Sequence, residues 1–190
     1  MLFYKRFRES IYMNIEELEE KTILEIKRIR EGASLPFFAN LGDAGMDICA
    51  AEDIIIRPEE SVLVPTGLIL NIPLGYEVQI RPRSGLSFHT RLRLPNAPGT
   101  IDAGYKDELF ILMYNTSPMY SSLDEHGKIR ELDLRERENR AGSYLIKSGD
   151  RICQMVFSKL TAVKPVLVEE FSEVNTLNRG GGFGSSGIKI

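Results

Sequence analysis

The sequence predicts an all-β fold, a barrel or sandwich built from many short strands. From residue 34 to 115, short runs rich in β-branched and aromatic residues alternate with glycine and proline. Proline is tolerated at strand ends and turns. Six prolines fall at or near such junctions: Pro58, Pro65, Pro73, Pro82, Pro95 and Pro98. The length of 190 residues and a hydrophobic share of 43% fit one domain with extensions.

The elements are expected in the following order. Residues 13–31 fit both a helical spacing and an isoleucine-rich strand, and we favour a short helix near 14–20 followed by a strand. Met13 is also an alternative start, which would leave residues 1–12 as an extension. Further strands are expected at 47–50, 61–64, 68–72, 76–81, 109–114, 144–146 and 151–159.

Residues 118–141 interrupt this pattern with many charges of both signs. Such a segment is most often a solvated helix or arm between strands. An arm that binds a partner is the alternative.

The composition argues against several classes of partner. A net charge of −3 provides no basic field for nucleic acid. No apolar run approaches the roughly 20 residues of a membrane span, and residues 1–8 are too charged for a secretory signal. Cys49 and Cys153 form no C-x-x-C pair and lie in apolar contexts, so we expect two buried thiols in a reducing cytoplasm.

The C-terminal tail spaces its glycines as G-x-G-x-x-G from Gly182 to Gly187. A dinucleotide-binding site needs a helix and a second strand after this motif, and only three residues follow it. What remains is a strip of backbone N–H groups with the guanidinium of Arg179, the ring of Phe183 and two hydroxyls. These groups suit a phosphate clamp with a base-stacking lid, while a disordered terminus is the alternative.

Two internal segments carry candidate chemistry. Residues 81–87, RPRSGLS, offer guanidiniums, hydroxyls and a glycine that admits an anion close to the backbone, with an ordinary polar turn as the alternative. Residues 96–109 place turns on both sides of Ile101-Asp102, which predicts a β-hairpin with an acid near its tip, or a surface hairpin whose acid caps a turn. Because the chain has two histidines and no phosphate-binding GxxxxGK loop, hydrolysis would rest on a carboxylate base.

These segments belong to five motifs in which the chain resembles the trimeric dUTPases (dUTP nucleotidohydrolases). The motifs are DAGMDI at 43–48, PRSGLS at 82–87, GTIDAGY at 99–105, GDRICQM at 149–155 and the glycine-rich tail. The resemblance covers roughly residues 22–187 outside the charged insertion, and five motifs in order make it specific. It implies a jelly-roll-like distorted barrel with an N-terminal extension (1–21), a β-domain (22–174, with the insertion at 118–141) and a tail (175–190) that closes over the active site.

The resemblance implies a dUTP diphosphatase that forms dUMP and pyrophosphate, keeping uracil out of DNA and supplying dUMP for thymidylate synthesis. Asp102 would deprotonate the water that attacks the α-phosphorus, a role typically worth ~10²–10⁴-fold in rate. Ser84 would lie near the α–β bridging oxygen, and Gln154 would contact the α-phosphate.

The same resemblance implies the substrate contacts. Arg83, Ser84 and Gly85 would hold the triphosphate, and Tyr105 would pack under the deoxyribose and exclude a 2′-hydroxyl. Asn96 and the backbone at Gly99 and Ile101 would read uracil, and Phe183 would stack on it. The remaining contacts implied are Asp102, Lys106, Gln154, Arg179, Gly184, Ser185 and Ser186.

The cofactor implied is Mg²⁺, held by the three phosphates and water without a direct protein ligand, with Asp47 near its water shell. The active sites would be shared between the subunits of a homotrimer, in a cytoplasmic enzyme with no nucleic-acid or membrane partner.

The chain departs from the family pattern in two motifs. Lys106-Asp107 follows Tyr105 where Arg-Gly is common, and the tail has Asn178 where an arginine is usual, with Arg179 one place later. Two alternatives stay open. One is a dCTP deaminase of the same fold, although the tyrosine-bearing segment at 99–105 favours the uracil-reading enzyme. The other is a nucleotide-responsive interaction protein that uses the charged insertion.

Overall fold

The structure, a computed structural model, describes residues 22–122, 127–128, 130–136 and 139–171. The helix expected near 14–20 and the glycine-rich tail lie outside these residues. The chain divides into two units, Met1–Leu160 and Thr161–Ile190. The described part of the second unit, residues 161–171, has exposed side chains and no regular secondary structure. No helix in the described part of the chain is long and apolar enough to cross a membrane.

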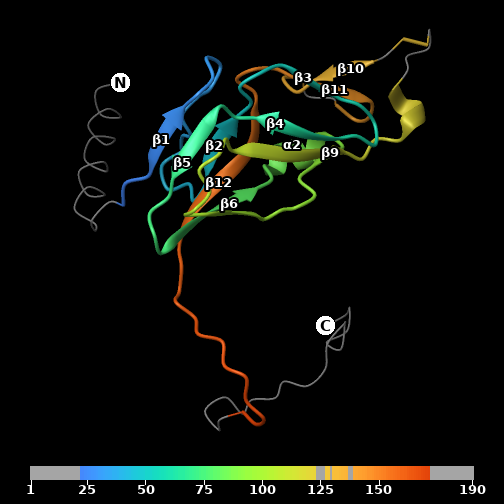
Figure 1. Cartoon of the computed structure of the whole chain (residues 1–190). Helices are drawn as coiled ribbons and strands as arrows, with labels where there is room; N and C mark the ends of the chain where they lie inside the picture. Colours follow the sequence, from blue (N-terminus) through green and yellow to red (C-terminus); the bar gives the residue numbers. More distant parts are fainter. Residues whose placement is uncertain (1–21, 123–126, 129, 137–138, 172–190) are drawn as a thin grey trace, which may run out of the picture. The chain divides into compact units, whose positions relative to one another are not determined.

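The first unit is all-β, as the sequence predicts (Figure 1). Its largest sheet joins β2 (Met46–Cys49), β12 (Arg151–Lys159), β6 (Tyr76–Arg81) and β8 (Gly99–Asp102) in that order, with antiparallel neighbours. A second antiparallel sheet joins β4 (Ser61–Pro65), β9 (Phe110–Asn115) and β7 (Leu92–Arg93). The third sheet has the order β10 (Glu131–Asp133), β11 (Ser143–Ile146) and β3 (Ile54–Ile56), and β1 (Glu25–Arg28) pairs with β5 (Leu68–Asn71). The described strands thus form four small sheets and no closed barrel.

Strands with a strong apolar pattern were predicted well. The strands at 76–81 and 151–159 have the predicted bounds, and β1 lies inside the strand expected after residue 21. Strands β3 and β7 escaped prediction because three and two residues are too few to show a period. The helix α2 (Ser84–His89) was not predicted, and a 3₁₀ helix covers Met119–Ser122.

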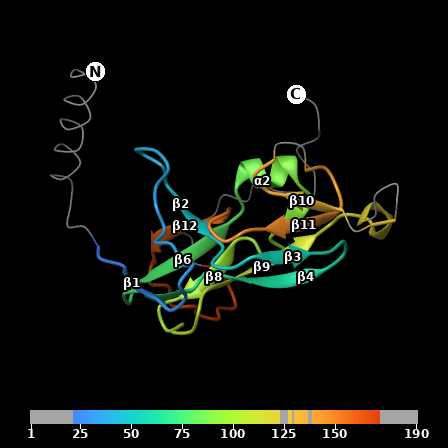
Figure 2. The same cartoon turned by 90° about the horizontal axis from the view of Figure 1, so that it is seen from above.

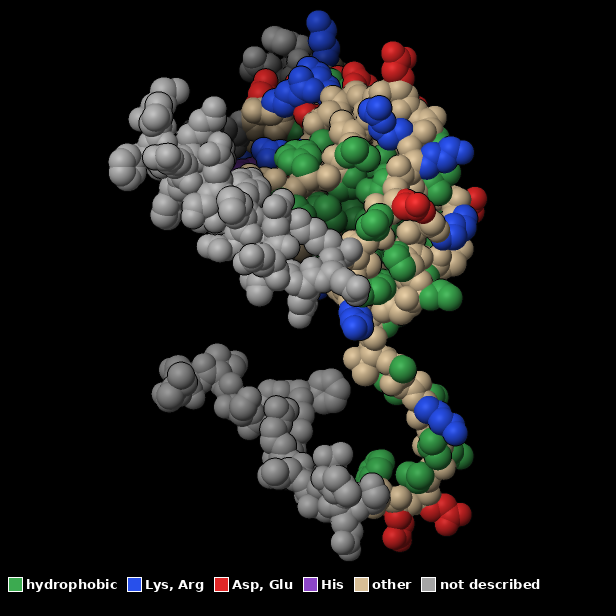
Figure 3. Space-filling model, turned by 90° about the vertical axis from the view of Figure 1, so that its left-hand side faces the viewer, with side chains coloured by type: hydrophobic (Ala, Val, Ile, Leu, Met, Phe, Trp, Pro, Cys, Tyr) green, Lys and Arg blue, Asp and Glu red, His purple; other side chains and the backbone are tan. Residues whose placement is uncertain are grey.

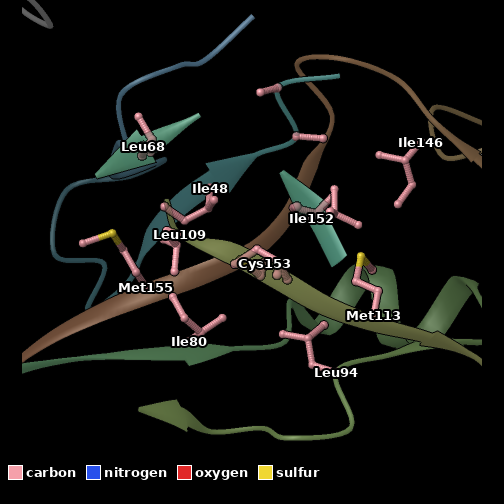
Figure 4. Close-up of a cluster of buried hydrophobic side chains, with 14 of the residues drawn as sticks. Ile48, Leu68, Ile80, Leu94, Leu109, Met113, Ile146, Ile152, Cys153 and Met155 are labelled. Carbon is pink, nitrogen blue, oxygen red and sulfur yellow. The ribbon is translucent and has the colours of Figure 1, made fainter. Parts of the chain in front are cut away.

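Strand β12 supplies much of the core because a β-bulge interrupts its pairing with β2 between Arg151 and Cys153. A bulge inserts an extra residue into one strand, so Ile152 and Cys153 are both fully buried instead of alternating. Figure 4 shows them in one cluster with Ile48 of β2 and Ile80 of β6. This packing fixes the strands that carry the first and fourth motifs side by side.

The prediction of a solvated helix or arm at 118–141 is wrong around residues 131–133, whereas the described residues 127, 128 and 130 are exposed as expected. Residues 131–133 form β10, which pairs in parallel with β11, and Leu132 is only 4% exposed. Arg135 Nε lies 2.8 Å from Asp150 Oδ1, and Lys147 Nζ lies 2.7 Å from Asp133 Oδ2. Figure 2 shows β10 and β11 beside α2. One buried leucine and two ion pairs therefore dock the insertion on the domain.

Candidate active site

A cleft of about 290 Å³ opens where the first, second and fourth motifs meet. Its walls come from the turn before β2, the end of β6, the start of α2 and the middle of β12. The lining residues are Ala39, Asp43, Ala44, Gly45, Asp47, Arg81, Arg83, Ser84, Gly85, Gln154 and Val156. All residues expected to bind phosphate through the second and fourth motifs, together with Asp47, therefore surround one cavity of a single chain.

Arg83 is held at this cleft by a carboxylate that two arginines share. Its Nε donates to Asp47 Oδ1 at 2.8 Å, and Arg151 Nη1 donates to Asp47 Oδ2 at 3.0 Å. Arg83 Nη1 also donates to the main-chain oxygen of Arg151 at 3.1 Å. Asp47 is only 8% exposed, so this carboxylate lies between two guanidiniums with little access to water. The arrangement fixes the Arg83 fork, and planar guanidinium forks match phosphate oxygens.

Gln154 explains why residue 45 is glycine. A Cβ on Gly45 would lie 2.6 Å from Gln154 Oε1, closer than real Cβ atoms approach. On its other side, Gln154 Nε2 donates to the main-chain oxygen of Pro82 at 3.0 Å. The amide is therefore wedged between the first and second motifs.

The start of α2 leaves room for a ligand. Ser84 and Gly85 are exposed, and a Cβ built on Gly85 meets no atom within 4 Å. Small residues at this point let an anion approach the main-chain N–H groups closely.

The third motif does not line this cleft. Asp102 lies at the end of β8 opposite Glu77 of β6, whereas Gln154 lies opposite Arg81 at the other end of β6. Four residues along β6 and two strand spacings across the sheet separate Asp102 from Gln154 by about 16 Å, taking ~3.3 Å per residue and ~4.8 Å per strand. The other third-motif residues and Asn96 are also absent from the lining of this cleft.

The hairpin expected at 96–109 differs in its pairing. Strand β8 pairs with β6, and the next strand, β9, pairs with β4 and β7. The turn after Asp102 is present, since Tyr105 N–H donates to the Asp102 carbonyl at 3.0 Å. Because β8 is the last strand in its sheet, its outer edge has no partner strand within the described chain.

The segment after Asp102 is anchored by a buried carboxylate. Glu108 accepts from Arg30 Nε and Nη2 at 2.7 Å each and from Gly67 N–H at 2.9 Å. These guanidinium bonds lower the pKa of Glu108 although burial acts in the opposite direction. Tyr105 Oη donates to the Glu108 carbonyl at 2.7 Å, and Lys106 Nζ donates to Asn71 Oδ1 at 2.8 Å. The tyrosine ring, 38% exposed, is thus pinned at its phenol end.

Three residues with structural roles at the site were missed from the sequence: Arg151, Arg30 and Glu108. Arg151 stands in the fourth motif, but nothing in its spacing identifies Asp47, 104 positions earlier, as its partner. Arg30 and Glu108 are 78 positions apart and belong to no motif. The predicted tail residues, Arg179, Phe183, Gly184, Ser185 and Ser186, lie outside the described residues.

Comparison with known proteins identifies the family of the chain. The family model described as dUTPase matches residues 31–128. A deoxyuridine 5'-triphosphate nucleotidohydrolase of Hydrogenobaculum sp. (strain Y04AAS1) is 39% identical over 167 residues, 87% of this chain and 99% of the relative. One from Clostridium kluyveri is 39% identical over 165 residues, 86% of this chain and 97% of the relative.

Solved structures give the same result. The dUTPase of Staphylococcus bacteriophage 80alpha with dUPNHPP has a TM-score of 0.73 and 33% identity, covering 88% of this chain and 100% of that one. A mutant dUTPase from phage phi11 of S. aureus, described with a structural Mg(II) ion, has a TM-score of 0.69 and 30% identity over 79% of this chain and 99% of its own. Since relatives of this identity match along nearly their whole length, the chain belongs to the dUTPase family.

Proposed function

We propose that this dUTPase hydrolyses dUTP with two groups of residues that belong to different copies of the chain. The cleft at 43–47, 83–85 and 154 binds the triphosphate, and Asp102 of another copy activates the water. The observation that carries the proposal is the convergence of the first, second and fourth motifs on one cleft that Asp102 does not line.

Arg83, Ser84 and Gln154 provide the phosphate chemistry. Arg83 binds phosphate oxygens as a preoriented fork because Asp47 and Arg151 already fix it. Ser84 donates toward the α–β bridging oxygen, where negative charge develops as pyrophosphate leaves, and Gln154 contacts the α-phosphate. Fixed donors aimed at developing charge need no reorganisation during the reaction, which is why they accelerate it.

Asp102, Tyr105 and the outer edge of β8 provide the base and the selectivity. The exposed Asp102 carboxylate takes the proton of the attacking water. The unpaired edge of β8 around Gly99 and Ile101 supplies main-chain donors and acceptors for uracil, with Asn96 beside it, and this tight wall rejects the thymine methyl. The pinned ring of Tyr105 sits under the deoxyribose and leaves no space for a 2′-hydroxyl.

The tail and Lys106 complete the site in the proposal. Phe183 stacks on uracil, Gly184 allows the close approach, and Ser185, Ser186 and Arg179 bind the β- and γ-phosphates. Closing the tail excludes water, which strengthens the electrostatic interactions inside.

The proposed assembly is a homotrimer with shared active sites. The separation of about 16 Å between Asp102 and Gln154 supports sharing, because both are assigned to the α-phosphate. Large exposed hydrophobic side chains also support association, and Figure 3 shows green side chains gathered on one face of the first unit. A surface of this kind often marks a protein interface.

The residues of the cleft fit a Mg²⁺ ion held mainly by the substrate. Both Asp47 oxygens already accept guanidinium donors, which leaves lone pairs for water but makes this carboxylate a poor direct ligand. Mg²⁺ usually keeps several waters and binds through substrate phosphates. Such an ion would supply positive charge beside the phosphates that Arg83 and Gln154 contact.

A cytoplasmic location is also proposed. Its support is that Cys49 and Cys153 are both free and buried. Burial raises the pKa of each thiol, which suits small core residues better than reactive ones.

Pyrophosphate release with Mg²⁺ and each of dUTP, UTP, dTTP and dCTP tests the selectivity, and release from dUTP alone is expected. Asp102→Asn should lower kcat about 10²–10⁴-fold while dUTP binding largely persists. Asp107→Asn is the matched control, because Asp107 is an exposed acid in the same segment. Normal turnover by Asp102→Asn would show that Asp102 is not the base, and dUTP formed from dCTP with release of ammonia would show a deaminase.

A further inference from the structure

A second cavity lies on the other side of Arg83, where the charged insertion meets α2. It has a volume of about 380 Å³, within the range of small-molecule sites. Arg83 and Gly85 line both cavities. The other walls of the second cavity are α2, residues 134–136 and 139 of the insertion and the turn at 149–151. Without the insertion this cavity would lack one wall.

A buried acceptor in the wall has no partner. Asn139 is 1% exposed, and its Oδ1 forms no hydrogen bond in the described structure. Its Nδ2 donates to the carbonyls of Asp133 at 2.5 Å and Glu136 at 3.1 Å, which fixes the orientation of the amide. A buried polar atom without a partner destabilises the protein, so a ligand whose N–H or O–H group reaches Asn139 Oδ1 would be stabilised here.

Three guanidiniums from different elements border the same space: Arg83, Arg135 and Arg151. Arg135 uses Nε and Nη2 on Asp150 and Ser148, and Arg151 uses Nη1 on Asp47. In the described structure this leaves Arg135 Nη1 and Arg151 Nε and Nη2 without hydrogen bonds. Among the described residues, the carboxylates that line the cavity are Asp150, already bonded through both oxygens, and the exposed Glu136.

We propose that this insertion cavity binds a small phosphate ester that also carries an N–H or O–H donor, of the size of a nucleoside monophosphate. The free guanidinium donors would take the phosphate, and Asn139 Oδ1 would accept from the base or sugar. The near balance of three guanidiniums and two carboxylates disfavours a bare anion, because little net positive charge attracts it. An ester gains from the acceptor as well as from the arginines.

The position of Arg83 between the two cavities predicts a consequence for the enzyme, which rests on the proposed function. A phosphate drawn to Arg151 and Arg83 from the insertion side competes with the triphosphate for the same guanidinium. We therefore expect occupancy to raise the KM for dUTP several-fold and to leave kcat nearly unchanged.

The test separates the two sites. The full-length protein is first titrated with dUpNHpp in a calorimeter. This dUTP analogue must bind if the proposed function is right. The saturated protein is then titrated with dAMP, dGMP, dCMP and dTMP, and with inorganic phosphate as the bare anion. Because the two ligands share only part of their sites and weaken each other by the same factor, we expect at least one monophosphate still to bind once per chain, several-fold more weakly than to the free protein and with a Kd below about 1 mM. Phosphate should bind more weakly still.

Variants assign the second binding event to the insertion cavity. Arg135→Gln and Asn139→Leu should each weaken it about tenfold or more, since each removes a hydrogen bond to the ligand. Leu134→Trp should abolish the second binding event by filling the cavity. Because this substitution removes no side-chain hydrogen bond, it keeps the test valid if the other variants fold poorly. Arg140→Gln, an exposed arginine of the insertion outside the cavity, should bind normally. No second event, or one that Leu134→Trp leaves intact, would overturn the proposal.

Discussion

Mixing two inactive variants of this dUTPase should restore activity. Arg83→Gln removes the proposed phosphate fork, and Asp102→Asn removes the proposed base. Arg83→Gln should still fold, because Asp47 keeps Arg151 as an ion-pair partner. If Asp102 serves the cleft of another copy, a mixed assembly contains sites with an intact fork from one variant and an intact base from the other.

The expected recovery follows from the arrangement. In a random one-to-one mixture, a site is complete when the cleft comes from the Asp102→Asn chain and the base from the Arg83→Gln chain, which gives about one quarter of wild-type activity in a closed ring. A site within one chain gives no recovery. The double variant mixed with wild type provides a second comparison, since a shared site predicts about one quarter and a single-chain site about one half.

The assay is pyrophosphate release by the two variants after they are co-expressed at equal levels with tags of different mass and purified together, without selection for mixed assemblies. Native mass spectrometry confirms that mixed assemblies are present. If mixed assemblies form and their activity equals that of the separate variants, Asp102 and the phosphate cleft belong to one copy, and the inference from their separation fails.

Three further predictions concern the described structure. Gly45→Ala places a Cβ 2.6 Å from Gln154 Oε1 and so displaces the amide. We expect kcat/KM to fall about tenfold with little change in melting temperature. Unchanged kinetics would show that the Gln154 amide is not needed at this position. Arg30 lowers the pKa of Glu108, so its ionised form stabilises the fold above the ordinary carboxyl pKa of 4.5, and this contribution is lost as pH falls through the lowered value. Glu108→Gln should cost about 2 kcal/mol at pH 7 and flatten the acid limb of stability measured by urea unfolding, and an unchanged limb would contradict this. Leu132→Ala should lower the free energy of unfolding by about 2–3 kcal/mol, whereas a loss below about 0.5 kcal/mol would mean that the insertion is not docked.

Local sequence patterns predicted the fold class and most strands because alternation and turn residues act over a few neighbours. The strand at 76–81 alternates between buried and more accessible positions, and its bounds were predicted correctly. The insertion was predicted wrongly because its charges dominate the local pattern, although one leucine and two ion pairs decide its position. Helix α2 was missed because its six residues are too few to show the hydrophobic periodicity of a helix.

The sequence by itself determined the family, through five motifs in order, and it predicts which residues do the chemistry: an acid, a phosphate fork, an amide and a tyrosine. Only the tertiary structure decided which of them meet. Strand order β2-β12-β6-β8 places Gln154 between Asp47 and Arg81, and it leaves Asp102 at the opposite end of β6. No local pattern specifies that order, because strand pairing is chosen by burial of the common core and links residues far apart in the chain.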